Sequence, residues 1–361
     1  MFGSIKLNNT NPNTWDVFIA KYDATGNVLW AKSAGGISFD EGNSVSADAN
    51  GNVLVTGAFF NPTITFGSIT LTNTGGYHQN VFIVKYDASG NVLWAKCTAA
   101  TADAVGYSVI TDPDGNVFVT GRGAMLSFDS ITLANTGMFV AKYDVNGNIL
   151  WAKRATGTGV SYNRGYSISS DEDGNVFVTG SFSSSAITLD SITLFLPLGS
   201  NNAMFIVKYD ANGDAICASV LPASGDGVSA DRFGNAYIGG GFAVNPFIIG
   251  ADTLLPTSTS YYRSNVFVAK YNSNISVTVN ELNNQESISV FPNPSSGNFT
   301  INPGNKTAET EIYIYDLLGN CILNKSINNN LEIDLSFQPK GIYFMEIVSG
   351  RKRQVKKLIL Q

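Results

Sequence analysis

The sequence is poor in charge, histidine and cysteine, and each shortage removes a class of function. Only 14% of the 361 residues are charged, against roughly 25% in an average globular protein. The single histidine, His78, has no second His or Cys near it, so neither a zinc site nor a Ser/His/Asp triad can be assembled around it. We interpret it as an exposed loop residue. Three scattered cysteines, Cys97, Cys217 and Cys321, form no disulfide framework and no zinc motif, so we expect no metal and no cofactor.

Long apolar runs are also absent. No stretch approaches the roughly 18 apolar residues of a membrane span, so no transmembrane segment is expected. Residues 1–6 show neither the basic nor the apolar region of a signal peptide. Because the chain also begins inside a repeat, we expect an N-terminally truncated sequence. The net charge of −6 argues against nucleic acid or an anionic membrane as a partner.

A repeat dominates residues 1–271. A segment of the form Val-Phe-Ile-Ala-Lys-Tyr-Asp returns with its Phe at positions 18, 82, 139, 205 and 267, in steps of 64, 57, 66 and 62 residues. Two further segments recur with it, and their copies at 51–57 and 66–71 read Gly-Asn-Val-Leu-Val-Thr-Gly and Phe-Gly-Ser-Ile-Thr-Leu. These segments are rich in β-branched and aromatic residues and are bounded by turn residues, so they predict strands.

The turns share one chemistry. Asp-x-x-Gly-(Asn/Asp) occurs eight times, with the Asp at 23, 48, 87, 112, 144, 171, 210 and 231. The Asp side chain can bond the backbone two residues on, and Gly supplies the positive φ that closes a hairpin. A unit then has four strands, as at 44–48, 53–59, 81–87 and 92–96. Tandem four-stranded antiparallel sheets predict an all-β fold with the blades of a β-propeller.

The repeated strands do not add up to a whole number of complete blades. Strand three has five copies and the other strands have four, with a partial unit at each end. The alternatives are a ring of four or five blades closed by its termini, or a fragment of a longer protein. The Gly-Asn-Val-Phe-Val-Thr-Gly signature after Asp-x-x-Gly resembles the bacterial β-propeller repeat family known as SBBP, over about residues 16–271.

Hairpin geometry places the Asp-x-x-Gly turns on one face and the longer connections on the other. The variable connections are 33–42, 60–80, 97–106, 154–165 and 183–203. Such a face is typical of a binding surface on a fixed scaffold. The unrepeated polar residues that could bind a ligand there are Asp40, Glu41, Asp103, Tyr162, Arg164 and Asp226. Solvated loop residues are the alternative interpretation.

Other candidates favour structural roles. The turn aspartates could suggest calcium, but the Gly and the bidentate Glu of an EF-hand loop are missing. The tryptophans of the repeated Trp-Ala-Lys segment, Trp30, Trp94 and Trp151, could stack on sugars, yet their fixed strand position favours packing between blades.

The repeat stops after Tyr271. Residues 272–287 are polar and predict a linker. Strand-like runs follow an opening strand near 290, at 297–303, 310–316, 321–327, 331–335, 341–348 and 353–360. Seven strands predict an Ig-like β-sandwich over residues 288–361.

This segment resembles the type A C-terminal sorting domain of the Bacteroidetes type IX secretion system. The matching motifs contain Phe291, Pro292, Asn293, Pro294, Asp316, Gly319, Gly341, Tyr343, Lys356 and Lys357. The resemblance implies export to the periplasm and recognition by an outer-membrane translocon. It also implies cleavage near the linker by a sortase-like peptidase, then release or attachment to surface lipopolysaccharide. The basic run around Lys356 accordingly favours a role in export over nucleic-acid binding.

We therefore expect a secreted or cell-surface, non-enzymatic propeller that binds a protein or glycan through its variable loops. The alternative is a secreted propeller hydrolase or lyase acting on polysaccharide. A retaining or inverting glycosidase needs two carboxyls about 5–10 Å apart, and the adjacent Asp40 and Glu41 do not by themselves establish such a pair.

Overall fold

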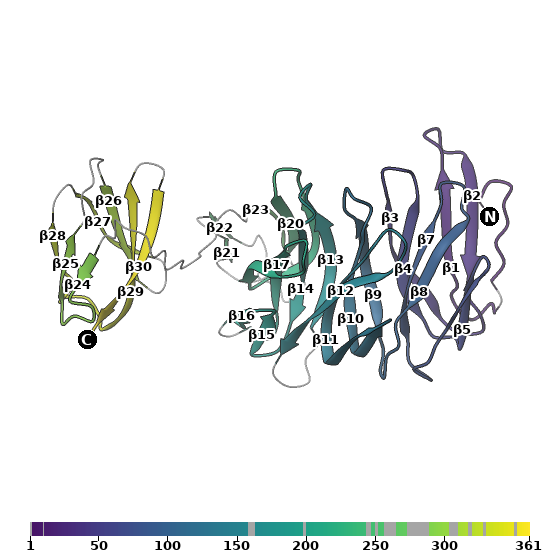
Figure 1. Cartoon of the computed structure of the whole chain (residues 1–361), viewed down its shortest axis with the longest axis horizontal. Helices are drawn as coiled ribbons and strands as arrows, with labels where there is room; N and C mark the ends of the chain where they lie inside the picture. The colour runs from purple at the N-terminus through teal and green to yellow at the C-terminus, as the bar shows by residue number, and fades with distance from the viewer. Residues whose placement is uncertain are drawn as a thin grey trace. The chain divides into compact units, whose positions relative to one another are not determined.

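In the part of the chain that the structure describes, every regular element is a β-strand, which confirms the all-β prediction (Figure 1). The computed structural model describes residues 2–9, 11–157, 163–197, 200–242, 247–249, 252–255, 265–272, 289–302, 310–316, 320–327, 330–349 and 352–361. Within these ranges, no helix has the length and apolar character of a membrane span. The chain divides into two compact units, Met1–Ser276 and Val277–Gln361, which we call the repeat body and the tail.

The repeat body is a succession of antiparallel sheets. Its strands are β1 (Val17–Tyr22), β2 (Val28–Ala34), β3 (Asp40–Ala47), β4 (Val53–Phe59), β5 (Thr63–Phe66), β6 (Ile69–Thr72), β7 (Asn80–Tyr86), β8 (Val92–Cys97), β9 (Val105–Thr111), β10 (Val117–Phe128), β11 (Ile131–Tyr143), β12 (Ile149–Gly157), β13 (Arg164–Ser170), β14 (Val176–Phe182), β15 (Ala186–Leu189), β16 (Ile192–Phe195), β17 (Ala203–Tyr209), β18 (Ala215–Leu221), β19 (Ser224–Ala230), β20 (Asn235–Phe242), β21 (Phe247–Ile249), β22 (Asp252–Leu254) and β23 (Asn265–Asn272).

Five main sheets follow one another along the chain, and we number them one to five. Their strand orders are β1-β2, β3-β4-β7-β8, β9-β10-β11-β12, β13-β14-β17-β18 and β19-β20-β23. In the third sheet β12 also pairs with β15 of the β15–β16 hairpin, which extends that sheet to six strands. Each complete sheet thus has the four strands that the repeat predicts, joined one-to-two and three-to-four by the Asp-x-x-Gly turns. The first sheet consists of strands three and four, and the last of strands one, two and three.

Each pair of neighbouring sheets encloses its own apolar core. Between sheets one and two, Val17 and Ile19 pack against Phe82, Val84 and Tyr86. The equivalent residues build the other cores: Val81 and Ile83 with Phe139 and Tyr143, Met138 and Val140 with Phe205 and Tyr209, and Met204 and Ile206 with Phe267. Strand three therefore presents its Val/Ile/Met side to the next sheet and its Phe/Tyr side to the previous one. Full burial of each such side chain contributes about 1.5–3 kcal/mol.

Serines link the first strands of neighbouring sheets. The backbone N–H of Val109 donates to Ser44 Oγ at 3.2 Å, that of Ile168 to Ser108 Oγ at 3.3 Å, and that of Val228 to Ser167 Oγ at 3.2 Å. These bonds hold β3, β9, β13 and β19 beside one another through the body.

The connections between strands two and three are more ordered than the predicted variable loops. Residues 60–80 contain the hairpin β5–β6 and residues 183–203 contain β15–β16, while β10 and β11 continue into each other as one long hairpin. The reason is burial, since Ile64 and Phe66 alternate inward with 1% exposure each. Three of these hairpins share a hydroxyl pair of 3.0 Å across the strands, at Thr65–Thr70, Ser127–Thr132 and Thr188–Thr193. Each complete repeat unit therefore contains, besides its four main strands, a hairpin between strands two and three.

A closed ring is not seen in the described part of the chain. The sheets run in order from β1–β2, near the N-terminus, to β19-β20-β23 at the other end of the body (Figure 1), and no strand pairing joins the first sheet to the last within the described ranges. The structure establishes an open succession of sheets.

The described residues of the tail form the seven strands that the sequence predicts, in two sheets around one core. They are β24 (Ser289–Phe291), β25 (Asn298–Asn302), β26 (Thr310–Tyr315), β27 (Cys321–Ile327), β28 (Leu331–Asp334), β29 (Gly341–Ser349) and β30 (Lys352–Leu360). The sheet orders are β24-β25-β28 and β27-β26-β29-β30. Phe299 and Ile301 of the first sheet share a buried cluster with Ile314, Met345 and Leu358 of the second.

Candidate functional site

The repeated turn aspartates are bound within their own turns. Asp48 Oδ1 accepts the backbone N–H groups of Asn50 at 3.0 Å and Asn52 at 2.9 Å, while Oδ2 accepts the Asn52 amide at 2.8 Å. The other turns repeat most of this pattern. Burial opposes ionisation of Asp48, but the bonds from Asn52 and Lys85 outweigh it and lower its pKa. These oxygens are thus occupied by local donors, which supports turn formation over calcium binding. Among the described residues no group of three or more His, Cys, Asp or Glu could hold a metal ion.

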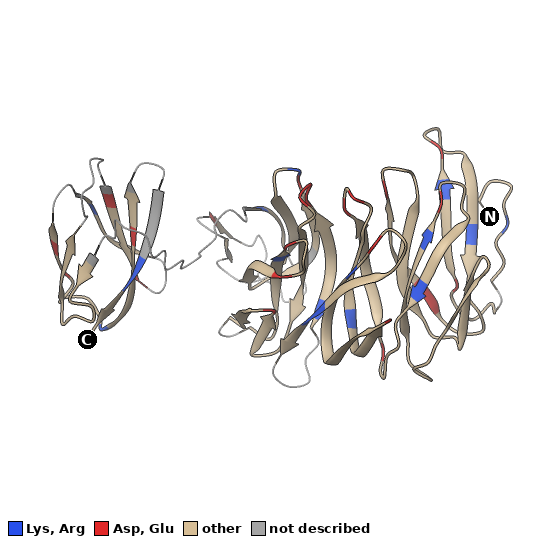
Figure 2. Ribbon diagram, in the orientation of Figure 1, with Lys and Arg blue, Asp and Glu red and all other residues tan. Residues whose placement is uncertain are grey.

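Strand three adds a buried lysine to three of the four turns between strands one and two. The Nζ atoms of Lys85, Lys142 and Lys208 lie 3.2, 3.7 and 3.1 Å from Asp48, Asp112 and Asp171. These side chains are at most 10% exposed, so each charge depends on its partner for compensation. Charged residues are sparse over the rest of the sheets (Figure 2).

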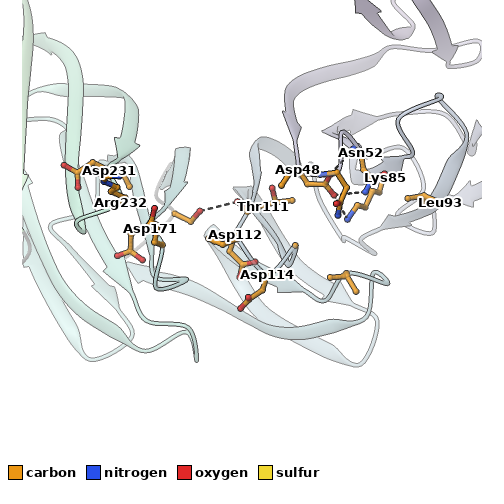
Figure 3. Close-up of a pocket in the computed structure, with 18 residues that line it drawn as sticks. Asp48, Asn52, Lys85, Leu93, Thr111, Asp112, Asp114, Asp171, Asp231 and Arg232 are labelled. Atoms are coloured by element: carbon orange, nitrogen blue, oxygen red, sulfur yellow. Dashed lines mark hydrogen bonds and ion pairs between the residues drawn. The ribbon is translucent and has the colours of Figure 1, made fainter.

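A pocket of about 610 Å³ lies along these turns (Figure 3). Its wall contains Asp48, Asp112, Asp171 and Asp231 from four successive sheets, and its outer residues include Asp114, Glu172 and Arg232. It lies on the face of the fixed turns, opposite the face where the sequence places its ligand-binding candidates. The wall aspartates Asp48, Asp112 and Asp171 are bound to lysines, so the charged groups that the pocket could offer a ligand are its other lining residues, such as Asp114, Glu172 and Arg232.

The tryptophans pack between sheets, as the repeat position predicts. The indole N–H groups of Trp30, Trp94 and Trp151 each donate over 3.1 Å to a backbone carbonyl in the next sheet, at Ala88, Val145 and Ala211. Each ring also lies near the buried tyrosine of that sheet, Tyr86, Tyr143 or Tyr209. Trp30 and Trp94 are each only 8% exposed, which leaves little of their ring faces for a sugar to stack on.

The predicted ligand-binding residues do not converge on one site. Asp40 is 1% exposed and accepts the Phe60 N–H at 3.2 Å and the Asn61 side-chain amide. Burial raises its pKa to about 6, and the nearby Asp16 acts in the same direction. Its neighbour Glu41 is half-buried on the same strand.

The remaining candidates lie on separate connections. Asp103 is exposed, lies 3.5 Å from His78 Nδ1 and accepts the Gln79 N–H at 3.1 Å. Arg164 begins β13, opposite Ser181. Asp226 lies within β19, although its side chain is outside the described residues, and Tyr162 lies outside them entirely.

A row of β-bulges, which the sequence reasoning missed, crosses this same end of strand one. In each of β3, β9, β13 and β19 one residue is skipped by the pairing with strand two, and these residues are Asn43, Tyr107, Tyr166 and Asp226. We call them the bulge row. A bulge re-aims a side chain and is frequent beside functional sites. The signal in the sequence is a varied residue inside a repeated Gly-x-(Ser/Gly), as in Gly106-Tyr107-Ser108.

The bulge row is continuous across sheets. The Tyr107 and Tyr166 rings lie 5.6 Å apart, and the Asn43 amide donates to the Gly106 carbonyl at 3.1 Å. Arg122 Nε donates to the Tyr107 hydroxyl at 3.0 Å. The strand-two glycine opposite each bulge makes room for it, because a Cβ at Gly121 would be 2.0 Å from the Val105 carbonyl oxygen. The row thus contains the half-buried rings of Tyr107 and Tyr166 and the exposed amide of Asn43, and the half-buried Arg122 of β10 lies beside it.

In the tail, the structure joins two of the sequence motifs. The Asn293 amide donates to the Lys357 carbonyl at 2.6 Å, and the Ile359 N–H donates to Asn293 Oδ1 at 2.9 Å. Asn293 therefore fastens the segment after β24 to the last strand. Tyr343 is buried and donates to the Pro339 carbonyl at 2.5 Å.

The other tail motifs have simple positions. Asp316 accepts the Asn320 N–H at 2.9 Å. Gly341 begins β29, and Lys356 and Lys357 are exposed on β30. Gly319 lies outside the described residues.

Comparison with known proteins bears on both units. An uncharacterized WD repeat-containing protein of Acanthamoeba polyphaga mimivirus is 28% identical over 252 residues, which cover 57% of this chain and 18% of that protein. The regulatory protein FlaEY of Caulobacter vibrioides is 31% identical over 87 residues, 22% of this chain and 9% of the relative. The chain thus spans less than a fifth of either relative.

Among solved structures, the extracellular domain of a proposed one-component system from Bacteroides thetaiotaomicron covers 96% of this chain and 49% of its own. Its identity is 12% and its TM-score 0.27. Residues 289–361 match the family described as "Secretion system C-terminal sorting domain". The tail therefore resembles a secretion-system sorting domain, and this match supports a secreted protein.

Proposed function

We propose that this protein is a cargo of the type IX secretion system whose repeat body is a segment of a β-propeller. The observation that carries the proposal is the sorting domain at residues 289–361. The motifs of that domain come together in the tail, where Asn293 binds the backbone of β30. The final location would be the cell surface or the medium, after cleavage near residues 272–287 by a sortase-like peptidase. The Ig-like character of the tail sandwich and the SBBP character of the repeats belong to the same proposal.

Transfer of the tail to a passenger tests the export function. A periplasmic fluorescent protein carrying residues 272–361 should reach the surface or medium of a bacterium with a type IX system. The same passenger carrying residues 272–288 alone should stay in the periplasm. Equal distribution of the two passengers would contradict the sorting role.

We propose that the repeat body is a non-enzymatic module that binds a protein or glycan through the bulge row. The support is the adjacent pair Tyr107 and Tyr166 of the row, together with Arg122, which donates to the Tyr107 hydroxyl. Aromatic and Arg side chains dominate the energetics of recognition surfaces. The candidate carboxyls, by contrast, are dispersed: Asp40 is buried beneath the surface and Asp103 is paired with His78.

Substitution in the row tests this binding role. The Tyr107→Ala/Tyr166→Ala variant should lose at least tenfold in affinity for whichever surface polysaccharide or envelope protein retains the unmodified body in affinity electrophoresis or pull-down. Tyr77→Ala, which removes a tyrosine that is 91% exposed elsewhere, should bind as the unmodified body does. Equal loss in both variants would contradict a role for the bulge row.

A further inference from the structure

The first sheet has an open edge at β1. In the complete sheets, strand three lies between strands two and four, as β7 lies between β4 and β8. In sheet five, β23 pairs with strand two, β20. β1 pairs with strand four, β2, but among the described residues no strand lies along its other edge. That edge presents a row of backbone donors and acceptors of the kind that strand addition uses.

Side chains that are buried in every complete sheet are exposed on β1. Phe18 is 61% exposed, whereas its equivalents Phe82, Phe139 and Phe205 are at most 1% exposed. Tyr22 is 50% exposed, whereas Tyr86, Tyr143 and Tyr209 are at most 4% exposed. The difference has a simple cause, because in the complete sheets strand two and the previous sheet cover these rings.

The lysine of β1 also lacks the partner that its equivalents have. Lys85, Lys142 and Lys208 each pair with the aspartate of the turn between strands one and two. Sheet one has no such turn, and within the described residues no ion pair involves Lys21, whose Nζ donates to the Ala88 carbonyl at 3.0 Å. The surface around β1 therefore combines an open strand edge, exposed aromatic rings and an uncompensated cation.

We infer that this surface binds a β-hairpin from a further unit of the same repeat type. Its second strand, of the form Val-x-Val-Thr-Gly, would pair with the β1 edge and cover Phe18. The Thr hydroxyl would donate to the Phe18 carbonyl, as Thr56 and Thr120 donate to the Phe82 and Phe139 carbonyls at 2.8 and 2.7 Å. The Asp of its Asp-x-x-Gly-Asn turn would pair with Lys21.

A second copy of this chain fits the edge less well. Its last sheet does expose Val266 and Val268, at 82% and 76%, on the side that faces the next sheet elsewhere in the body. However, both edges of β20 are already paired, with β19 and β23. That copy therefore has no free strand two among its described residues for the β1 edge. The interaction does not depend on ligand binding at the bulge row.

A peptide with the sequence of residues 44–59 is the direct probe, and its binding to the full chain is measured by fluorescence anisotropy. We expect Phe18→Asp and Lys21→Asp to weaken binding at least tenfold. A peptide with Lys in place of its Asp48 should bind the Lys21→Asp chain better than it binds the unmodified chain. Leu29→Asp, at an exposed position of the neighbouring strand β2, is the matched control and should bind normally. Peptide binding that is indifferent to Phe18 and Lys21 would overturn the inference.

If the free peptide does not fold, the same hairpin can be tested as an extension of the chain itself. A copy of residues 38–65 placed directly before Phe2 continues the 64-residue offset that relates Phe18 to Phe82. It should raise the midpoint of thermal unfolding, followed by tryptophan fluorescence, by roughly 5 °C or more. The same extension with Asp at its copy of Val55 should give no rise. No rise with either extension would overturn the inference, as would self-association of the unmodified chain that Val268→Asp abolishes, because that result assigns the surface to a second copy.

Discussion

The indole ring of Trp94 lies directly against Gly147 of the next sheet. A Cβ on Gly147 would be 2.8 Å from Trp94 Cδ2, and the Trp94 N–H bonds the carbonyl of Val145 in the same turn. The pairs Trp30–Gly90 and Trp151–Gly213 repeat this contact. The series stops at sheet four, where Cys217 takes the place of the tryptophan. The turn between strands three and four is therefore a socket for the tryptophan of the previous sheet.

Substitution of the socket glycine should lower the free energy of unfolding of the repeat body by more than the penalty for a positive φ alone. Gly147→Ala places a β-carbon at φ +81° and against the ring, so we expect a loss of about 2–4 kcal/mol in the free energy of unfolding. The control is Gly26→Ala, at φ +87° with nothing within 4 Å of its Cβ, which should cost about 1 kcal/mol. Urea unfolding followed by tryptophan fluorescence measures both, because all four tryptophans lie in the repeat body. Equal losses would show that the socket contributes nothing.

A lysine of strand three should contribute to the free energy of unfolding only where a buried aspartate pairs with it. Lys142→Met leaves Asp112 buried without its cation, so we expect a loss of about 3 kcal/mol in unfolding free energy. Lys21→Met removes the equivalent lysine where no buried aspartate depends on it, and should change stability by no more than about 0.5 kcal/mol. The same urea titration compares them, and a loss at Lys21 as large as that at Lys142 would contradict the role of the ion pair.

Asp40 should make the body less stable as the pH rises. Burial raises its pKa to about 6, so its folded form binds a proton more tightly than its unfolded form. The resulting stabilisation is present below about pH 4 and is lost as the pH rises through about 6. Asp40→Asn should remove this dependence, so the variant should gain on the unmodified protein by up to about 3 kcal/mol between pH 4 and pH 7. Asp103→Asn, at an exposed carboxyl, is the control; a similar gain in that variant would contradict the assignment.

The hydrogen bonds of Asn293 should protect the last strand, β30, against local unfolding. Asn293→Ala removes both hydrogen bonds to β30, at an expected cost of about 1–3 kcal/mol to the tail. Trypsin should then cleave at the exposed Lys356 and Lys357 several-fold faster in native conditions, as mass spectrometry of the released C-terminal peptide reports. Asn324→Ala, at an exposed position of β27, should leave the rate unchanged. If trypsin cleaved Asn293→Ala no faster than Asn324→Ala, the proposed stabilisation of β30 by Asn293 would be contradicted.

The strands and turns could be predicted because their causes are local. Asp48 and Gly51 determine their turn by themselves, and eight copies of the pattern set the spacing of the strands. The tail strands were predicted almost to their ends for the same reason. The packing of Trp94 between sheets was also predictable, since its place in the repeat never varies.

The remaining features depend on contacts that are distant in the sequence. The sequence predicts a variable loop at residues 60–80, whereas the structure shows that Ile64 and Phe66 of this segment are buried. The repeated Gly-x-(Ser/Gly) marks the position of the bulge at Tyr107, but its pairing opposite Gly121 depends on a strand distant in the sequence. Ring closure is likewise a matter of how successive sheets pack, which the repeat length alone does not determine.

Export is the central claim, and the mature C-terminus tests it most directly. The native bacterium is fractionated into cytoplasm, periplasm, outer membrane and medium, and the protein in each fraction is mapped by mass spectrometry. The account predicts that the surface or medium form lacks residues 289–361 and ends within about 272–290. A chain that remains in the cytoplasm and is intact through Gln361 would contradict it.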